Sequence, residues 1–166
     1  MKLKNKVAFL TAAAGVGIGQ AVVRTFAREG ARIVVTDAHA DRARNVALAI
    51  QKEYGTDALG LGCDVTRRNE VELAVKETIV NFGRIDILFN NAGTNRPSQI
   101  ADMKDEDWEL VINVSLRGVF YCCRAVLPIM MDQKYGRIVN TTSVAGFRGL
   151  KAVSYTHLTL PTIYSV

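Results

Sequence analysis

The chain alternates between short apolar runs and longer segments in which apolar and polar positions mix. Five apolar runs, some rich in β-branched residues, predict buried strands at 7–10, 31–36, 58–63, 85–89 and 137–142. The segments between them, at 18–29, 41–54, 69–82 and from about 105 towards 131, have the apolar spacing of helices. Strands that alternate with helices favour a parallel sheet with right-handed crossovers. We therefore expect an α/β fold.

Local signals refine these helices. Asn69, with Glu72 three positions later, predicts a capping box at the start of the third helix. Acidic residues around Asp105 suit the start of the fourth helix, and Pro128 should kink that helix or end it early. Three inner faces are predicted, for the first, third and fourth helices: Ile18, Val22 and Phe26; then Val71, Ala74, Val75, Thr78, Ile79 and Phe82; then Trp108, Val111, Ile112, Val119 and Phe120.

The junction between the first strand and the first helix reads VAFLTAAAGVGIG, from Val7 to Gly19. A tight turn between a strand and a helix lets backbone amides face a phosphate at the helix N-terminus, where the peptide dipoles favour negative charge. Gly15, Gly17 and Gly19 lack a Cβ, so the chain can adopt positive φ and a pyrophosphate can approach closely. Spaced glycines occur in many folds, and here their position between a predicted strand and a predicted helix favours a phosphate-binding turn.

Asp37 follows the second predicted strand, eighteen residues after Gly19. In a βαβ unit that binds a dinucleotide, an acid at this place accepts hydrogen bonds from the adenosine ribose hydroxyls. A 2′-phosphate would meet like charge, so we expect NAD to be preferred and NADP to be possible. A solvated loop carboxylate is the alternative interpretation, and the spacing from the glycines favours the cofactor role.

Length and composition fit one globular domain, with 166 residues of which 49% are hydrophobic. The net charge is +5, but basic and acidic residues are interspersed, so we expect no nucleic-acid partner. The cysteines at positions 63, 122 and 123 lack the spacing of a disulfide framework or a zinc site. They suit a reducing, cytoplasmic compartment, and no metal site is expected.

The N-terminus imitates a short secretory signal, because Lys2, Lys4 and Lys6 precede an apolar run. Cleavage there would remove the first strand and open the glycine turn, which disfavours this interpretation. No uninterrupted apolar run is long enough to span a membrane, and no membrane partner is expected.

The order of these motifs resembles the short-chain dehydrogenase/reductase family, from Lys6 to about Gly149. In family sequence come the glycine turn, Asp37, the pair 64–65, the Asn-Asn-Ala-Gly run at 90–93 and Ser143 after the fifth strand. The resemblance implies a Rossmann-like doubly wound parallel sheet in three layers, α/β/α, of about five strands in the order 3-2-1-4-5. It assigns residues 1–151 to an NAD(P)-binding domain. The implied activity is hydride transfer that interconverts a secondary alcohol and a ketone, both small molecules.

The resemblance also implies the site residues. Asp64 and Val65 would flank the adenine. The implied cofactor-binding set is Thr11, Gly15, Gly17, Ile18, Gly19, Asp37, Asp64, Val65, Asn91, Ala92 and Gly93. Ser143 would hold the substrate oxygen, and Tyr155, twelve residues later, would exchange the proton. Ser115 stands where the family often has a catalytic asparagine. Relatives also imply a homo-oligomer, either a dimer or a tetramer.

The sequence departs from the family pattern at several positions. Ala12 replaces the usual glycine after the threonine, in a turn that is one residue longer. Thr159 replaces the family's lysine four residues after the tyrosine, and Pro161 would end the helix expected there. Residues 152–166 contain no Asp, Glu, Lys or Arg, and we interpret them as an atypical, non-native tail.

These departures predict a weak or inactive catalyst. A non-enzymatic dinucleotide-binding module is therefore the main alternative to an enzyme. A methyltransferase can also join a glycine-rich turn to an acid after the second strand, but the Asn-Asn-Ala-Gly run at 90–93 argues against it.

Overall fold

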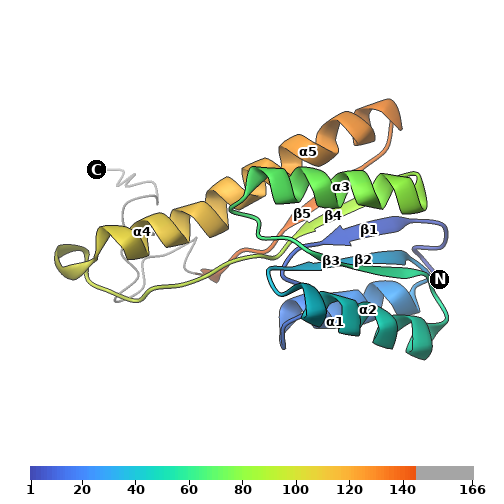
Figure 1. Cartoon of the computed structure of the whole chain (residues 1–166), viewed down its shortest axis with the longest axis horizontal. Helices are drawn as coiled ribbons and strands as arrows, with labels where there is room; N and C mark the ends of the chain where they lie inside the picture. Colours follow the sequence, from blue (N-terminus) through green and yellow to red (C-terminus); the bar gives the residue numbers. More distant parts are fainter. Residues whose placement is uncertain (145–166) are drawn as a thin grey trace, which may run out of the picture.

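The computed structural model describes residues 1–144, and Figure 1 shows their arrangement. The strands are β1 (Val7–Leu10), β2 (Arg32–Asp37), β3 (Ala58–Gly62), β4 (Ile87–Asn90) and β5 (Arg137–Asn140). The α-helices are α1 (Ile18–Arg28), α2 (Ala40–Tyr54), α3 (Arg68–Phe82), α4 (Asp105–Ile112) and α5 (Gly118–Asp132). A 3₁₀ turn, η1 (Ile100–Asp102), precedes α4, and a π-helical segment, η2 (Asn113–Arg117), joins α4 to α5. Tyr155 and the segment 152–166 lie outside the described residues.

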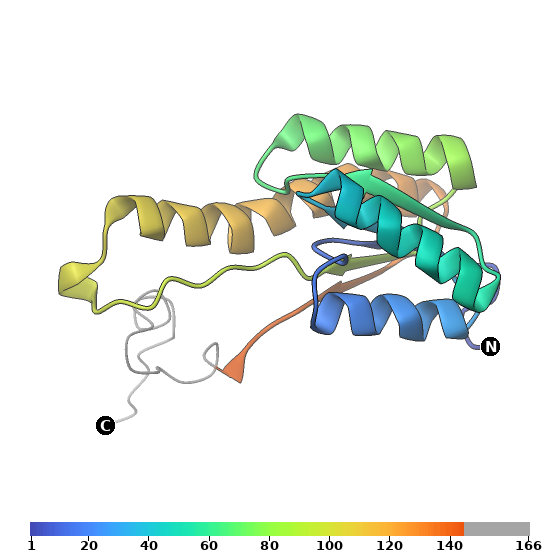
Figure 2. The same cartoon turned by 60° about the horizontal axis from the view of Figure 1, so that its bottom comes forward.

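All strand pairs in the described part are parallel, in the order β3-β2-β1-β4-β5. Helices α1 and α2 cover one face of the sheet, and α3 and α5 cover the other (Figures 1 and 2). This arrangement confirms the predicted Rossmann-like α/β/α fold and its strand order.

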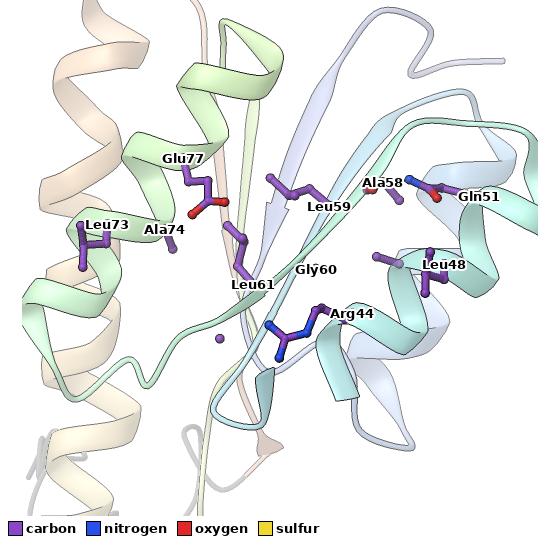
Figure 3. A pocket seen from close by; sticks show the side chains of 12 residues that line it. Arg44, Leu48, Gln51, Ala58, Leu59, Gly60, Leu61, Leu73, Ala74 and Glu77 are labelled. Carbon is purple, nitrogen blue, oxygen red and sulfur yellow. Dashed lines mark hydrogen bonds between the residues drawn. The ribbon is translucent and has the colours of Figure 1, made fainter. Parts of the chain in front are cut away.

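Strand β3 forms one edge of this sheet, between α2 and α3. The two helices and the strand border a groove of about 600 Å³ (Figure 3). Arg44 and Leu48 line it from α2, and Leu73 and Glu77 line it from α3. None of the predicted site residues lines this groove.

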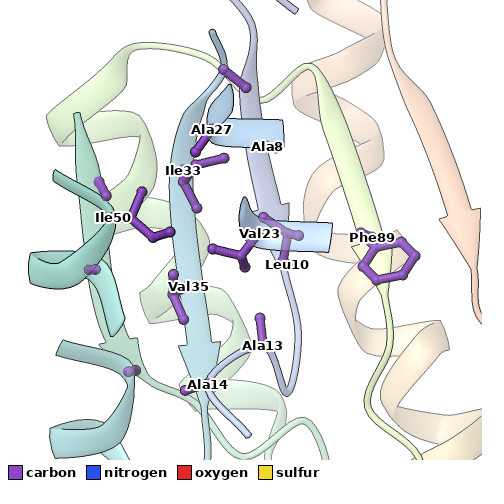
Figure 4. Packing of buried hydrophobic residues seen from close by; sticks show 14 of the residues in the cluster. Ala8, Leu10, Ala13, Ala14, Val23, Ala27, Ile33, Val35, Ile50 and Phe89 are labelled. Carbon is purple, nitrogen blue, oxygen red and sulfur yellow. The ribbon is translucent and has the colours of Figure 1, made fainter. Parts of the chain in front are cut away.

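The pleat of the strands divides the core into two clusters. On the face covered by α1 and α2, Leu10 and Val35 pack against Val23 and Ile50 (Figure 4). On the other face, a second cluster joins the sheet to α3 and α5: Val7, Phe9, Val34, Leu88, Val71, Val75, Cys122, Val126 and Met130. Because neighbouring side chains of a strand point to opposite faces, a run buried on both faces must be apolar throughout.

The predicted inner face of α1 is wrong by one position. Ile18 is 60% exposed, whereas Gly19, Val23 and Ala27 are buried. Val22 and Phe26 are half-buried at the margin of the cluster. The stripe that begins at Gly19 carries two small residues, which lets the helix approach the sheet closely.

The predicted capping box of α3 is also wrong. The helix begins at Arg68, Asn69 is exposed, and the carboxylate of Glu72 bonds Arg68 instead. The carboxylate of Glu70 accepts the amide of Asp64 at 2.8 Å and so ties the end of β3 to the start of α3.

Pro128 does not end α5, which continues to Asp132.

The continuous helical segment Asp105–Asp132 has 28 residues and is long and apolar enough to cross a membrane, by length and composition alone. This is weak evidence for a membrane, since core helices of soluble proteins pass the same test. Of its predicted inner face, Val111 is buried, but Phe120 is 54% exposed.

The amino-terminal ends of the central strands meet at a buried carboxylate. Arg84 donates to both oxygens of Asp86, at 2.7 and 2.6 Å, and the amide of Val7 donates at 2.9 Å. The Nζ atom of Lys6 lies 3.6 Å from the same group. Burial raises the pKa of Asp86, but these hydrogen bonds and charges outweigh it, so the pKa lies below its ordinary value.

We expect Asp86→Asn to lower the free energy of unfolding at pH 7 by about 2 kcal/mol, because bonds to a charged group are lost. Since the folded pKa is lowered, the carboxylate stabilises the fold above about pH 4 and loses this effect as the pH falls through the folded pKa. Urea unfolding at pH 7 and pH 3 measures both effects. Asp132→Asn, at an exposed position, is the control. An equal deficit at both pH values would contradict the assignment.

Candidate functional site

The glycine turn joins β1 to α1 at the carboxyl edge of the sheet. Gly17 is the N-cap of α1 and has φ +128°, which glycine adopts readily and other residues rarely do. A Cβ on Gly15 or Gly17 would meet no heavy atom within 4 Å, so the backbone borders open space. Ile18, the first residue of α1, is exposed beside it. Amides at a helix N-terminus with open space beside them can accommodate a phosphate.

Ala12 occupies a left-handed conformation, with φ +46°. This conformation costs a non-glycine residue roughly 1–2 kcal/mol. Ala12 therefore replaces the family's glycine at a position whose backbone conformation still suits glycine.

Thr11 links the end of β1 to the end of β4. Its Oγ1 accepts the amides of Asn91 at 2.9 Å and Ala92 at 3.0 Å, and its own amide donates to the carbonyl of Phe89 at 3.1 Å. Thr11 is 1% exposed, so these bonds form away from solvent. The threonine therefore fixes the segment 91–93 relative to the glycine turn.

The side chain of Asn91 completes this link. Its Nδ2 donates to the carbonyl of Ala12 at 3.1 Å, and its Oδ1 accepts the hydroxyl of Thr141 at 3.3 Å. A Cβ on Gly19 would lie 2.7 Å from the carbonyl of Ala12 and 2.8 Å from Asn91 Nδ2. Gly19 is therefore needed for the close approach of α1, whereas Gly17 is needed for its φ angle.

Asp37 lies at the end of β2 with its side chain 4% exposed. Its Oδ1 accepts the amide of His39 at 3.0 Å and Arg42 Nη2 at 2.6 Å. The carboxylate is thus held in place beside the start of α2, as a ribose-binding acid at the end of the second strand requires.

Asp64 and Val65 follow β3. The Oδ1 atom of Asp64 accepts the amide and the hydroxyl of Thr66, at 2.9 and 2.8 Å. Val65 is buried, and a Cβ on Gly118 would lie 2.7 Å from it. The absence of a side chain at Gly118 therefore lets the long helix pack directly on Val65.

Ser115 lies in the π-helical segment η2 and is exposed. A Cβ on Gly93 would lie 4.0 Å from Ser115 Oγ, so the segment after β4 passes beside this serine. Asn113 bonds Arg117 through its side chain. Single π turns inside α-helices are frequent at functional sites.

Ser143 is exposed and follows the end of β5 by three residues. The described site residues therefore gather at the carboxyl ends of the strands, where the strand order reverses between β1 and β4. Ligands of open α/β sheets bind at this place.

Comparison with known proteins decides the family. The sequence model of the short chain dehydrogenase family matches residues 6–156, most of the chain. This chain belongs to the short-chain dehydrogenase family. This family is a family of oxidoreductases.

Several curated members of the short-chain dehydrogenase family are similar to this chain. A 3-oxoacyl-(acyl-carrier-protein) reductase of Synechocystis sp. is 41% identical over 147 residues, covering 89% of this chain and 59% of the relative. The enzyme of that name from Thermotoga maritima is 39% identical, covering 90% and 60%. The chain thus spans about three fifths of the length of these relatives.

A solved structure supports the same assignment. The crystal structure of an NAD⁺-bound xylitol dehydrogenase has a TM-score of 0.87 and 34% identity, covering 92% of this chain and 58% of that one. The described residues of this chain fit a dinucleotide, because the glycine turn borders open space and a buried carboxylate lies at the end of the next strand.

Three polar residues near the site were not among the predicted site residues, although one of them, Asn90, begins the run at 90–93. Thr141 bonds Asn91, and Arg42 bonds Asp37, as described above. Asn90 is 3% exposed and donates to Asn140 Oδ1 at 2.9 Å, while its own Oδ1 has no hydrogen-bond partner among the described residues. A polar residue at the end of an otherwise apolar strand was the available signal for Asn90.

The described residues offer neither a reactive buried thiol nor a cluster of metal ligands. Burial raises the pKa of Cys63 and of Cys122 to about 12, so both thiols stay protonated near neutral pH and are poor nucleophiles. Within residues 1–144, no group of three or more His, Cys, Asp or Glu side chains could hold a metal ion.

We expect Gly19→Ala to lower the free energy of unfolding by about 1–3 kcal/mol, since its methyl group overlaps the carbonyl of Ala12 and the amide of Asn91. Gly15→Ala is the matched control, because its methyl group enters open space. Its change should stay within about 0.5 kcal/mol. Urea unfolding followed by circular dichroism measures both, and equal stability of the two variants would contradict the described packing of α1.

Proposed function

We propose that this chain binds NAD in preference to NADP, as part of an enzyme that interconverts a secondary alcohol and a ketone. The observation that carries the proposal is the pairing of the open glycine turn with the buried carboxylate of Asp37, at neighbouring strands β1 and β2. The relatives described above, a 3-oxoacyl-(acyl-carrier-protein) reductase and a xylitol dehydrogenase, support a small-molecule substrate with a carbonyl or hydroxyl group.

The cofactor would lie across the carboxyl ends of β1, β2 and β4. The amides from Gly15 to Ile18 hold the diphosphate, and Asp37 accepts the hydroxyls of the adenosine ribose. Asp64 and Val65 border the adenine. The segment 91–93, which Thr11 fixes in place, would border the nicotinamide end of this cofactor site.

The substrate oxygen would be held by Ser143 and would exchange its proton with Tyr155. When bound, the nicotinamide ring supplies or accepts the hydride at the substrate carbon. Ser115 occupies the π turn beside Gly93 and contributes a hydroxyl where the family often has an asparagine amide. A hydroxyl can donate and accept a proton, so a relay through Ser115 is chemically feasible.

Thr159 argues for weak catalysis by this chain. A free tyrosine has a pKa near ~10 and is a poor base at neutral pH unless a nearby positive charge lowers that value. Thr159 supplies no such charge. The same residue favours the alternative of a dinucleotide-binding module without catalysis.

Titration of the chain with NAD and NADP by calorimetry tests the cofactor role, and Asp37→Asn sharpens the test. We expect this variant to bind NAD about tenfold more weakly and to lose much of its preference over NADP, because a charged acceptor of the ribose hydroxyls is removed. Asp57→Asn, at an exposed position, should leave both affinities unchanged. Absence of binding by the unmodified chain would remove the basis of the proposal.

Turnover separates the enzyme from the binding module. A panel of secondary alcohols with NAD, followed by the absorbance of the reduced cofactor, should give a low rate that Ser143→Ala and Tyr155→Phe abolish. If these variants and the unmodified chain bind NAD equally and none shows turnover, the binding module is the better description.

We also propose a cytoplasmic homo-oligomer, either a dimer or a tetramer, without a membrane or nucleic-acid partner. The support is a stripe of exposed apolar residues on one face of the long helix: Leu116, Phe120, Leu127 and Met131. Their spacing places them on a single line along the helix. A second copy of this surface would cover the stripe.

Leu127→Glu should shift the chain towards the monomer, because burying an unpaired carboxylate in an apolar contact is unfavourable. Light scattering after size-exclusion chromatography measures the mass. Leu48→Glu is the matched control, since Leu48 is an exposed leucine on α2, away from this stripe. Loss of association in the control alone would assign the contact to another surface.

A further inference from the structure

The ion pair between Arg42 and Asp37 joins a buried partner to an exposed one. Asp37 is 4% exposed, whereas Arg42, in the first turn of α2, is 47% exposed. Arg42 Nη2 lies 2.6 Å from Asp37 Oδ1, which also accepts the amide of His39. Both bonds fall on Oδ1, and Oδ2 takes part in neither of them. The carboxylate is therefore fixed from one side, while the guanidinium remains accessible to solvent.

The ion pair changes the charge that a ligand meets at the end of β2. Asp37 alone would repel the additional phosphate of NADP. The guanidinium of Arg42, within hydrogen-bond distance of the carboxylate, offsets this negative charge. Arginine also has a planar set of N–H donors that matches the oxygens of a phosphate.

We propose that Arg42 determines how strongly this site discriminates against NADP. The inference rests on the proposed role of Asp37 in binding the adenosine ribose. With NAD, Arg42 holds the carboxylate and Oδ2 is available to the ribose hydroxyls. With NADP, the exposed guanidinium contacts the 2′-phosphate and offsets its repulsion by Asp37. Arg42 is thus a specificity-determining residue that keeps NADP binding measurable.

Arg44 provides a matched control for Arg42. Arg44 lies on the same helix, is 59% exposed and pairs with Asp41 at 2.7 Å. It has the same charge as Arg42 and a similar exposure, but its partner is an exposed carboxylate outside the proposed cofactor site. Loss of either arginine changes the net charge of the chain equally.

The test is calorimetric titration of NAD and NADP into the unmodified chain and into Arg42→Gln, Arg42→Lys and Arg44→Gln. We expect Arg42→Gln to weaken NADP binding about tenfold or more and NAD binding less than about threefold, because only NADP carries the additional phosphate. Arg42→Lys keeps the charge and should recover most of the NADP affinity. Arg44→Gln should leave the ratio of the two affinities unchanged. Coincident thermal unfolding curves verify that the variants fold.

Four results would overturn the inference. Arg42→Gln could weaken NAD and NADP equally, which indicates a general structural role. The ratio could stay unchanged, or Arg44→Gln could change it as much as Arg42→Gln does. If the unmodified chain binds NAD but no NADP, Arg42 does not act as described. If it binds neither, the proposed function itself fails, so the two failures are distinguishable.

Discussion

The set of hydrogen bonds around the Thr11 hydroxyl is the interaction on which the site depends. The strand order reverses between β1 and β4, and the chain leaves these two strands in different directions. Two amides of the segment after β4 donate to one buried oxygen at the end of β1, which holds the two departing segments together. Without this link, the segment 91–93 would be tied to the glycine turn mainly by the side chain of Asn91, which donates to the carbonyls of Thr11 and Ala12.

Close packing of small residues is the second constraint. Gly19 lets α1 approach the turn and the amide of Asn91, and Gly118 lets the long helix approach Val65. Each contact lies directly beside a predicted cofactor-binding position. The shape of the proposed cofactor site therefore depends on the absence of side chains at these glycines as much as on the polar side chains around it.

The sequence was sufficient to predict the fold but only part of the site. Apolar runs located the five strands of the described part, their alternation with helices indicated a parallel sheet, and the family resemblance implied the correct strand order. Periodicity alone misplaced the buried face of α1, because the neighbouring stripe through Gly19 packs more closely than the larger Ile18 would. The bonds of Asn91 to Thr11 and Thr141 could not be predicted, since they join residues that are 80 and 50 positions apart. The same holds for Arg42, whose partner depends on the path of the chain between β2 and α2.

The separation of Thr11 from Asn91 has a consequence for how the domain is made. Strands β1, β2 and β3 with α1 and α2 form a continuous stretch, so this part of the sheet can collapse early during synthesis. The turn that would grip the diphosphate receives its last hydrogen bonds only after Asn91 has left the ribosome, some 80 residues later. Completion of the proposed cofactor site is thereby postponed to a late stage of biogenesis, and a nascent chain interrupted before β4 would lack the bonds that hold this loop in place.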